Sequence, residues 1–241
     1  MTKILGFALG YLTDEVTSRN SNNLLDLLKK LNFSGIEITF ADKERLYACN
    51  LSPEIKRILK KFQYVSIHAL FDLVKKSENE KEIIKQMDII ARLYSEIGAK
   101  NVIMHPNNLP SPRMLSKYNL KISTENLKKK RNITVSKFRE IFKKYPKLGL
   151  CIDTSHAYSW SKYETGRLVE TFKNRITQIH LSARYKGKDH RSLRGASKDF
   201  MFSISTIKKL NVPLMIEEGF DKINSKSIKE ETIYIEKCLL R

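Results

Sequence analysis

The chain has 241 residues, of which 41% are hydrophobic, so it is long enough to bury a full core. No apolar run approaches the roughly 20 residues that a membrane span requires. The N-terminus leads directly into a strand pattern and lacks the apolar segment and cleavage site of a signal peptide. We therefore expect a cytoplasmic protein with no membrane partner. The three cysteines are widely spaced and predict neither a disulfide framework nor a paired-cysteine metal site.

The net charge is +19 at pH 7. Such a charge fits a polyanionic partner such as nucleic acid, or a phosphorylated substrate. It fits equally well a lysine-rich composition that solvates the helices on all sides, because lysines recur on most of the expected helices. A basic run at residues 128–131 directly follows Glu125 and would face the same region.

Strands and helices alternate along the first half of the chain. The expected strands are residues 4–9, 35–40, 64–70 and 101–104, and the expected helices are residues 22–31, a second that begins after Ser52, and a third that ends near residue 97. Ser52 followed by Pro53 is an N-cap signal. Ser77 and Glu80 form a capping-box pattern at the start of the third helix, which Gly98 ends.

The second half repeats the alternation after a short irregular connection, in which Pro110 and Pro112 leave little room for a full helix. The expected strands are residues 120–124, 148–153, 176–181 and 213–216, and the expected helices are residues 135–145, 164–173, 197–210 and 227–240. A basic loop is expected over residues 184–194. Eight strands, most of them followed by a helix, indicate a parallel α/β sheet closed into a (β/α)8 TIM barrel. No linker interrupts the pattern, so we expect a single domain over residues 1–241.

Histidines and carboxylates gather where the expected strands end. Four of the five histidines lie at or just past a strand end, and the fifth lies in the loop after one. The full set is His68, His105, Glu125, Asp153, His156, His180, His190 and Glu217. Because the carboxyl ends of barrel strands share one face, we expect these side chains to converge.

The set as a whole indicates a metal centre. A lone histidine at a strand end is more often a structural hydrogen-bonding residue, but a cluster of acids and histidines is costly without a cation or a ligand. Mixed imidazole and carboxylate ligands suit Zn, Mn or Fe(II) rather than Ca. The eight groups are enough for two or three ions if carboxylates bridge them. Glu37 lies in an earlier strand, and we expect it to remain outside the ligand set.

The chain resembles the xylose isomerase-like TIM barrel superfamily, AP endonuclease family 2, over nearly its whole length. The motifs closest to the endonuclease IV branch are GLCIDTSHAY at 149–158, IMHP at 103–106, TEN at 124–126, IHL at 179–181 and PLMIE at 213–217. The pair His68 and His105 is more selective, because single-metal sugar epimerases often lack it. The chain departs from the endonuclease IV pattern at Lys188-Asp189-His190, where that branch has Asp-x-His.

The resemblance implies zinc sites and a DNA substrate. One ion would bind His68, His105 and Glu125; a second would bind Glu125, Asp153, His180 and Glu217; a third would bind His156 and His190. The implied activity is a zinc-dependent phosphodiesterase that hydrolyses DNA at abasic sites, with Glu125 orienting the attacking water. Basic residues at the mouth would neutralise flanking phosphates. Phe71 would stack at the lesion or, alternatively, pack in the core.

A sugar or sugar-phosphate isomerase or epimerase is the alternative enzyme. Glu125, Asp153, His180 and Glu217 would then hold a single divalent ion such as Mn. Glu125 and Glu217 would be the catalytic acids and bases, exchanging a proton on opposite faces of an enediolate. The number of bound ions separates the two hypotheses. A metal-binding barrel without activity is the third alternative.

Overall fold

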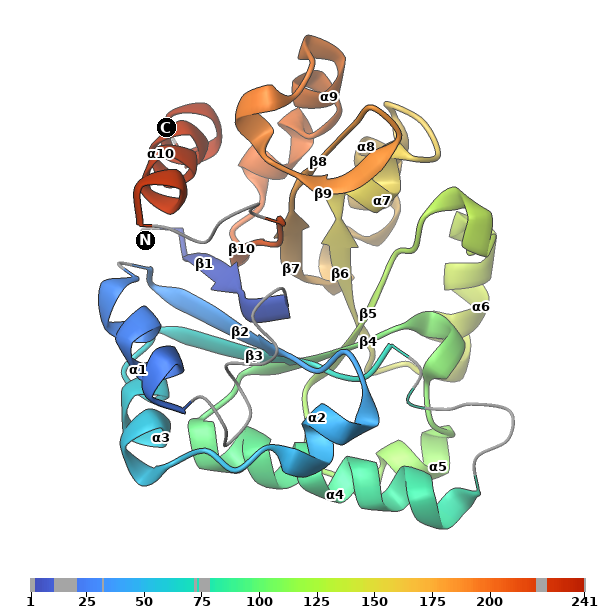
Figure 1. Ribbon diagram of the computed structural model, residues 1–241. Coiled ribbons are helices and arrows are strands. Elements are labelled where there is room, and N and C mark those ends of the chain that lie inside the picture. The colour runs from blue at the N-terminus through green and yellow to red at the C-terminus, as the bar shows by residue number, and fades with distance from the viewer. Residues whose placement is uncertain are drawn as a thin grey trace.

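The computed structural model describes residues 3–10, 21–31, 33–71, 73, 79–219 and 225–240. Eight parallel strands close into a barrel in the order β1-β10-β7-β6-β5-β4-β3-β2. They are β1 (Leu5–Ala8), β2 (Gly35–Thr39), β3 (Tyr64–His68), β4 (Asn101–Met104), β5 (Ile122–Glu125), β6 (Gly149–Asp153), β7 (Ile176–Leu181) and β10 (Leu214–Ile216). Helices surround the strands (Figure 1). The expected (β/α)8 barrel is therefore confirmed.

The helices vary from a single turn to five turns. They are α1 (Ser21–Lys30), α2 (Lys43–Ala48), α3 (Pro53–Leu59), α4 (Glu80–Ile97), α5 (Pro112–Leu115), α6 (Val135–Lys144), α7 (Thr154–Tyr158), α8 (Glu164–Phe172), α9 (Lys198–Ser203) and α10 (Ser225–Ile235). Short 3-10 turns follow several strands and helices, and a π-helical turn, Glu236–Leu240, extends α10. Among the described residues, none of the helices has the length and apolar character needed to span a bilayer.

Local hydrogen bonds explain several helix starts. Ser52 accepts a hydrogen bond from the Ile55 amide at 3.2 Å and begins α3, as predicted. At α4 the N-cap is Asn79, whose side chain accepts from the Glu82 amide at 2.9 Å. The predicted cap of that helix, Ser77, lies outside the described residues.

The structure differs from the expectations in three places. Residues 197–210 do not form one helix: α9 ends at Ser203, whose hydroxyl donates to the Phe200 carbonyl at 2.6 Å, and a 3-10 turn follows. The short helix α2 was not expected, although Asp42 provides its N-cap. His156, expected only at or just past a strand end, lies in the short helix α7.

The alternation of strand side chains separates two interiors. In β2, Ile36 and Ile38 belong to the apolar core between the strands and the helices, whereas Glu37 is buried among polar groups inside the barrel. In β3 the same alternation places Ile67 in the apolar core and His68 inside the barrel. The strand register therefore brings polar side chains of different strands together at the carboxyl end.

A small hairpin follows β7, where the sequence analysis expected only a basic loop. It consists of β8 (Ala183–Tyr185) and β9 (Lys188–Arg191), which pair antiparallel. Lys186 and Gly187 join them with φ values of 51° and 73°, as a two-residue type I′ turn requires. The hairpin contacts α7, and Figure 1 shows it in orange beyond the ends of β6 and β7. It carries His190 toward the barrel mouth.

Candidate metal centre

A pocket of about 650 Å³ opens at the carboxyl ends of the strands. Six of the eight predicted ligands line it, namely His68, His105, Glu125, His156, His190 and Glu217. The other two, Asp153 and His180, lie beneath it and are fully buried. Donor atoms of the eight residues form overlapping groups, and within each group the atoms lie within 4.8 Å of one another. The structure thus brings together all eight residues that the sequence singled out.

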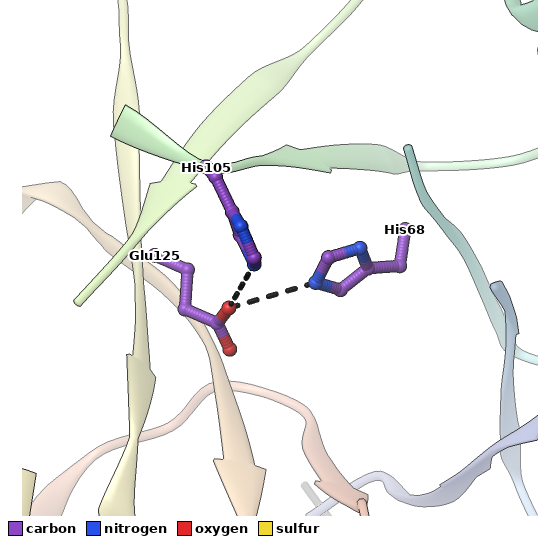
Figure 2. Close-up of side chains that lie close together, drawn as sticks. All are labelled: His68, His105 and Glu125. Carbon is purple, nitrogen blue, oxygen red and sulfur yellow. Dashed lines mark ion pairs between the residues drawn. The ribbon is translucent and has the colours of Figure 1, made fainter. Parts of the chain in front are cut away.

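The first group consists of His68, His105 and Glu125 (Figure 2). Glu125 Oε2 lies 3.2 Å from His105 Nε2 and 3.5 Å from His68 Nε2. His68 Nδ1 lies 2.9 Å from the Ala69 carbonyl, to which its N–H donates. That bond leaves the Nε2 lone pair directed at the centre of the group, as metal ligation requires.

The second group shares Glu125 with the first and adds Asp153, His180 and Glu217. His180 Nδ1 lies 2.5 Å from Glu125 Oε1 and 3.0 Å from Glu217 Oε2. Asp153 Oδ1 accepts hydrogen bonds from the His156 amide at 2.6 Å and from Ser155 at 2.9 Å. Its Oδ2 atom is buried and accepts no hydrogen bond from the described residues. An orphaned carboxylate oxygen facing an imidazole and two carboxylates fits a divalent cation.

The third group consists of Asp153, His156 and His190. His156 Nδ1 lies 3.0 Å from the Asn126 carbonyl, and the Asn126 side chain makes two hydrogen bonds, of 2.8 and 2.9 Å, with the Asp153 backbone. His190 has a left-handed backbone with φ of 52°, and its Nδ1 lies 3.1 Å from the Glu217 carbonyl. The third group therefore offers three donors, one of which it shares with the second.

Asp189 does not add a donor to the third group. Its Oδ2 atom accepts from Lys128 at 2.6 Å, and its Oδ1 atom pairs with Arg184. Because two cations hold this carboxylate, it stays bound to the β5–α6 connection and its own hairpin instead of joining His190. The Lys-Asp-His sequence at residues 188–190 thus supplies one metal-type donor, the histidine.

Protonated imidazoles in the cluster compensate for the negative charges of its carboxylates. Burial opposes protonation of His68, yet hydrogen bonding and charge from Glu125 raise its pKa to about 9. Burial likewise opposes the charged form of His180, but the surrounding anionic groups raise its pKa well above the usual value. Despite burial, the charge of His180 holds the pKa of Glu125 well below its ordinary range and lowers that of Glu217 to about 2. Protons on imidazoles therefore balance the carboxylates, and divalent cations would displace those protons.

Three further residues lie close to the donor groups. Cys151 is buried and offers a sulfur within the same 4.8 Å range of Glu125 and His180. Asn126 fixes Asp153 and His156, and only its position directly after Glu125 pointed to it. Phe71, for which a core position was the alternative, is 42% exposed, lines the pocket and stacks on His105 with ring centroids 5.2 Å apart.

The comparisons place the chain among known proteins. The xylose isomerase-like TIM barrel family matches residues 25–238. No curated protein matches the chain. Similar solved structures include endonuclease IV from Thermus thermophilus, with 16% identity over 97% of this chain and 99% of that one at a TM-score of 0.69.

Other similar structures carry different activities. A D-tagatose 3-epimerase-like protein has 18% identity over 97% of this chain and 98% of its own, with a TM-score of 0.67. The probable 3-DHS dehydratase AsbF from Bacillus anthracis has 12% identity, covers 97% of this chain and 98% of its own, and has a TM-score of 0.70. At these identities the likeness establishes the fold and does not choose between reactions. The chain belongs to the xylose isomerase-like TIM barrel family.

Proposed function

We propose that this protein is a zinc-dependent phosphodiesterase of the endonuclease IV type that hydrolyses DNA at abasic sites. The observation that carries the proposal is the connection of three donor groups through shared carboxylates. Glu125 belongs to the first and second groups, and Asp153 belongs to the second and third. Shared carboxylates suit neighbouring ions that act on a single phosphate.

The first group would hold one zinc, the second group another, and the third group, with its three donors, a further ion. Bound zinc supplies Lewis-acid polarisation of the phosphate and activation of water at neutral pH. Glu125 and Glu217 both line the pocket and both approach His180 Nδ1, at 2.5 and 3.0 Å. Glu125 would orient the attacking water, and Glu217 would be the second catalytic carboxylate. Phe71 stacks against the exposed base or sugar at the lesion.

Basic residues at the pocket rim favour a nucleic-acid substrate. Lys128 and Arg131 both line the pocket, and both lie in the basic run at residues 128–131. Lys128 is paired with Asp189, whereas Arg131 is exposed. Together with the net charge of +19, these residues would neutralise phosphates that flank the lesion.

A sugar or sugar-phosphate isomerase or epimerase remains the second candidate, because the second group alone offers four ligands for one ion. In that reaction Glu125 and Glu217 exchange a substrate proton on opposite faces of an enediolate. Both carboxylates lie within 3.0 Å of the same imidazole nitrogen, His180 Nδ1. A single manganese ion would satisfy this arrangement.

Metal content and DNA cleavage together test the proposal. Elemental analysis of protein purified without chelator should give two or three zinc ions per chain. The same preparation should cleave a duplex oligonucleotide with one abasic-site analogue and leave the undamaged duplex intact. Chelator should abolish cleavage, and added zinc should restore it. A single bound manganese, no cleavage and turnover of a ketose or sugar phosphate would replace the proposal with the second candidate.

A further inference from the structure

A column of polar side chains runs through the barrel beneath the pocket, where barrels usually pack branched apolar residues. Tyr64 donates to Gln178 Oε1 at 2.8 Å, and Gln178 Nε2 donates to Glu37 Oε2 at 2.6 Å. Glu37 in turn contacts His180. All of these side chains are at least 90% buried. The column thus ends on a residue of the second donor group.

Glu37 is the charged member of the column and makes no contact with the pocket. Its Oε2 atom accepts hydrogen bonds from Gln178, from Ser66 at 2.7 Å and from His180 Nε2 at 3.3 Å. Its Oε1 atom is buried, lies 3.1 Å from His180 Nε2 and makes no hydrogen bond with the described residues. A fully buried carboxylate is costly unless each oxygen is satisfied. His180 Nε2 lies 3.1 and 3.3 Å from the two oxygens of Glu37, so a proton on Nε2 stabilises this carboxylate.

The two sides of the His180 ring then have different roles. With the proton of Nε2 directed at Glu37, the other nitrogen, Nδ1, faces Glu125 and Glu217. Gln178 Nε2 and His180 Nε2 approach to 2.9 Å because both donate to the same carboxylate. A hydrogen bond from the second ring nitrogen to a carboxylate fixes the tautomer and the orientation of a metal-binding histidine.

We propose that Glu37 is a positioning residue that holds His180 with its proton on Nε2 and presents Nδ1 to a metal ion. This inference rests on the metal centre of the proposed function, and it does not depend on which reaction that centre performs. It assigns a role to a buried glutamate that contributes no ligand itself.

The substitution Glu37→Gln tests this role because the surroundings dictate how the new amide must turn. Ser66 and Gln178 both donate to the Oε2 position, so the amide oxygen belongs there. The amide NH₂ group then occupies the Oε1 position and donates to His180 Nε2. The imidazole proton moves to Nδ1, the nitrogen that would bind the metal. A nearly isosteric change thus reverses the tautomer.

Two controls separate positioning from general stability. Ser66→Ala removes one donor to Glu37 but keeps the contact between Oε1 and His180. Glu164→Gln makes the same chemical change at another buried glutamate, whose described partner is Arg167 on its own helix. Circular dichroism and thermal melting of the metal-free proteins establish that each variant folds.

The experiment measures zinc affinity by competition with a chromophoric chelator and the state of His180 by ¹⁵N–¹H correlation of its ring. In the zinc-loaded wild type we expect a protonated Nε2 and a metal-bound Nδ1. Glu37→Gln should weaken zinc binding by roughly 10- to 100-fold, whereas both controls should stay within about threefold of wild type.

Each outcome decides the inference. Wild-type affinity in folded Glu37→Gln, or a metal-bound Nε2 in the wild type, overturns it. If Glu37→Gln does not fold, the ring nitrogens of the wild type still decide it. If the wild type binds no zinc, the metal centre and this inference fail together. If zinc binds as expected but abasic DNA is not cleaved, the proposed reaction fails and the role of Glu37 stands.

Discussion

The candidate metal centre has a strand-borne part and a hairpin-borne part, and the two are supported differently. His68, Glu125 and His180 lie on barrel strands and are at most 1% exposed. His190 lies on the hairpin, its side chain is 20% exposed, and its backbone has a positive φ. The register of the closed sheet fixes the first three side chains, whereas a two-residue turn and a few loop contacts fix the fourth. We therefore infer a tightly preorganised first and second group and a more easily perturbed third group.

The largest effect is expected from Glu125→Gln, which strikes the residue shared by the two strand-borne groups. It removes a bridging carboxylate and leaves three nearby histidines without their common anion. Zinc content should fall by at least one ion per chain, and cleavage should fall by more than the roughly 10–100-fold typical of losing an outer hydrogen bond to a ligand. Elemental analysis and single-turnover cleavage measure both. Unchanged zinc content would contradict the bridging role.

A smaller and more selective effect is expected from His190→Ala, which affects only the hairpin-borne group. Zinc titration should show the loss of the weakest ion while the two tighter ions keep their affinities within a few-fold. Cleavage should fall by roughly 10–100-fold. Arg191→Ala, at the next position of the hairpin, serves as the control. Equal loss of all ions would show that the two parts of the centre are not independent.

A still smaller effect is expected from Arg131→Ala, which leaves both parts of the centre intact. The variant loses one exposed cation at the rim, so binding to abasic DNA should weaken and the slope of log K against log salt should fall by about 1. Lys147→Ala is the matched control, because Lys147 is exposed and precedes β6 at the opposite end of the barrel. Equal slopes for the two variants would indicate that the basic charge solvates the surface without directing DNA.

The smallest effect is expected on the pH dependence of folding stability, through two carboxyl groups next to the hairpin. Burial, followed by the charge and hydrogen bond of Glu231, raises the pKa of Glu218 to about 9. Glu231 in turn accepts a hydrogen bond from the Leu193 amide at 2.6 Å, just after β9. A raised carboxyl pKa means that the protonated form stabilises the fold, fully below its ordinary value of 4.5 and progressively less as pH rises through about 9.

The substitution Glu218→Gln should remove this pH-dependent loss of folding stability. Between pH 6 and pH 9.5, the free energy of unfolding of the metal-free variant should rise relative to wild type by on the order of 1 kcal/mol. The melting temperature should rise correspondingly, by about 2–4 °C. Glu230→Gln, at a half-buried neighbouring carboxylate that pairs with Arg194, should melt in parallel with wild type. Parallel melting of Glu218→Gln over the same range would argue against a protonated Glu218.

The sequence predicted the strand-borne part better than the hairpin-borne part for physical reasons. A strand end is visible locally in the apolar pattern, and the barrel rule then brings His68, His105 and Glu125 to one face. The contact between Glu37 and His180 joins residues 143 positions apart and depends on which strands face each other across the barrel. No local sequence pattern predicts a contact between residues so far apart in the chain. The ion pair between Lys128 and Asp189 is equally non-local, so the sequence left the fate of Asp189 open.

The sequence does contain a local indication of the hairpin. Lys186-Gly187, between short alternating segments, is typical of a tight turn. The cap of α4 shows the opposite case, in which the sequence offered Ser77 and the structure uses Asn79, two positions later. Boundaries therefore moved by a few residues while the site residues kept their relation to the strand ends.

On the proposed function, metal binding would also tie the survival of the protein to metal supply. Ions that bind the folded barrel and not the unfolded chain add stability that grows with the logarithm of their free concentration. In a cell short of zinc, the polar barrel interior would lose that contribution, and more chains would unfold and reach proteases. The abundance of the protein, and not only its activity, should then follow the metal content of the cell.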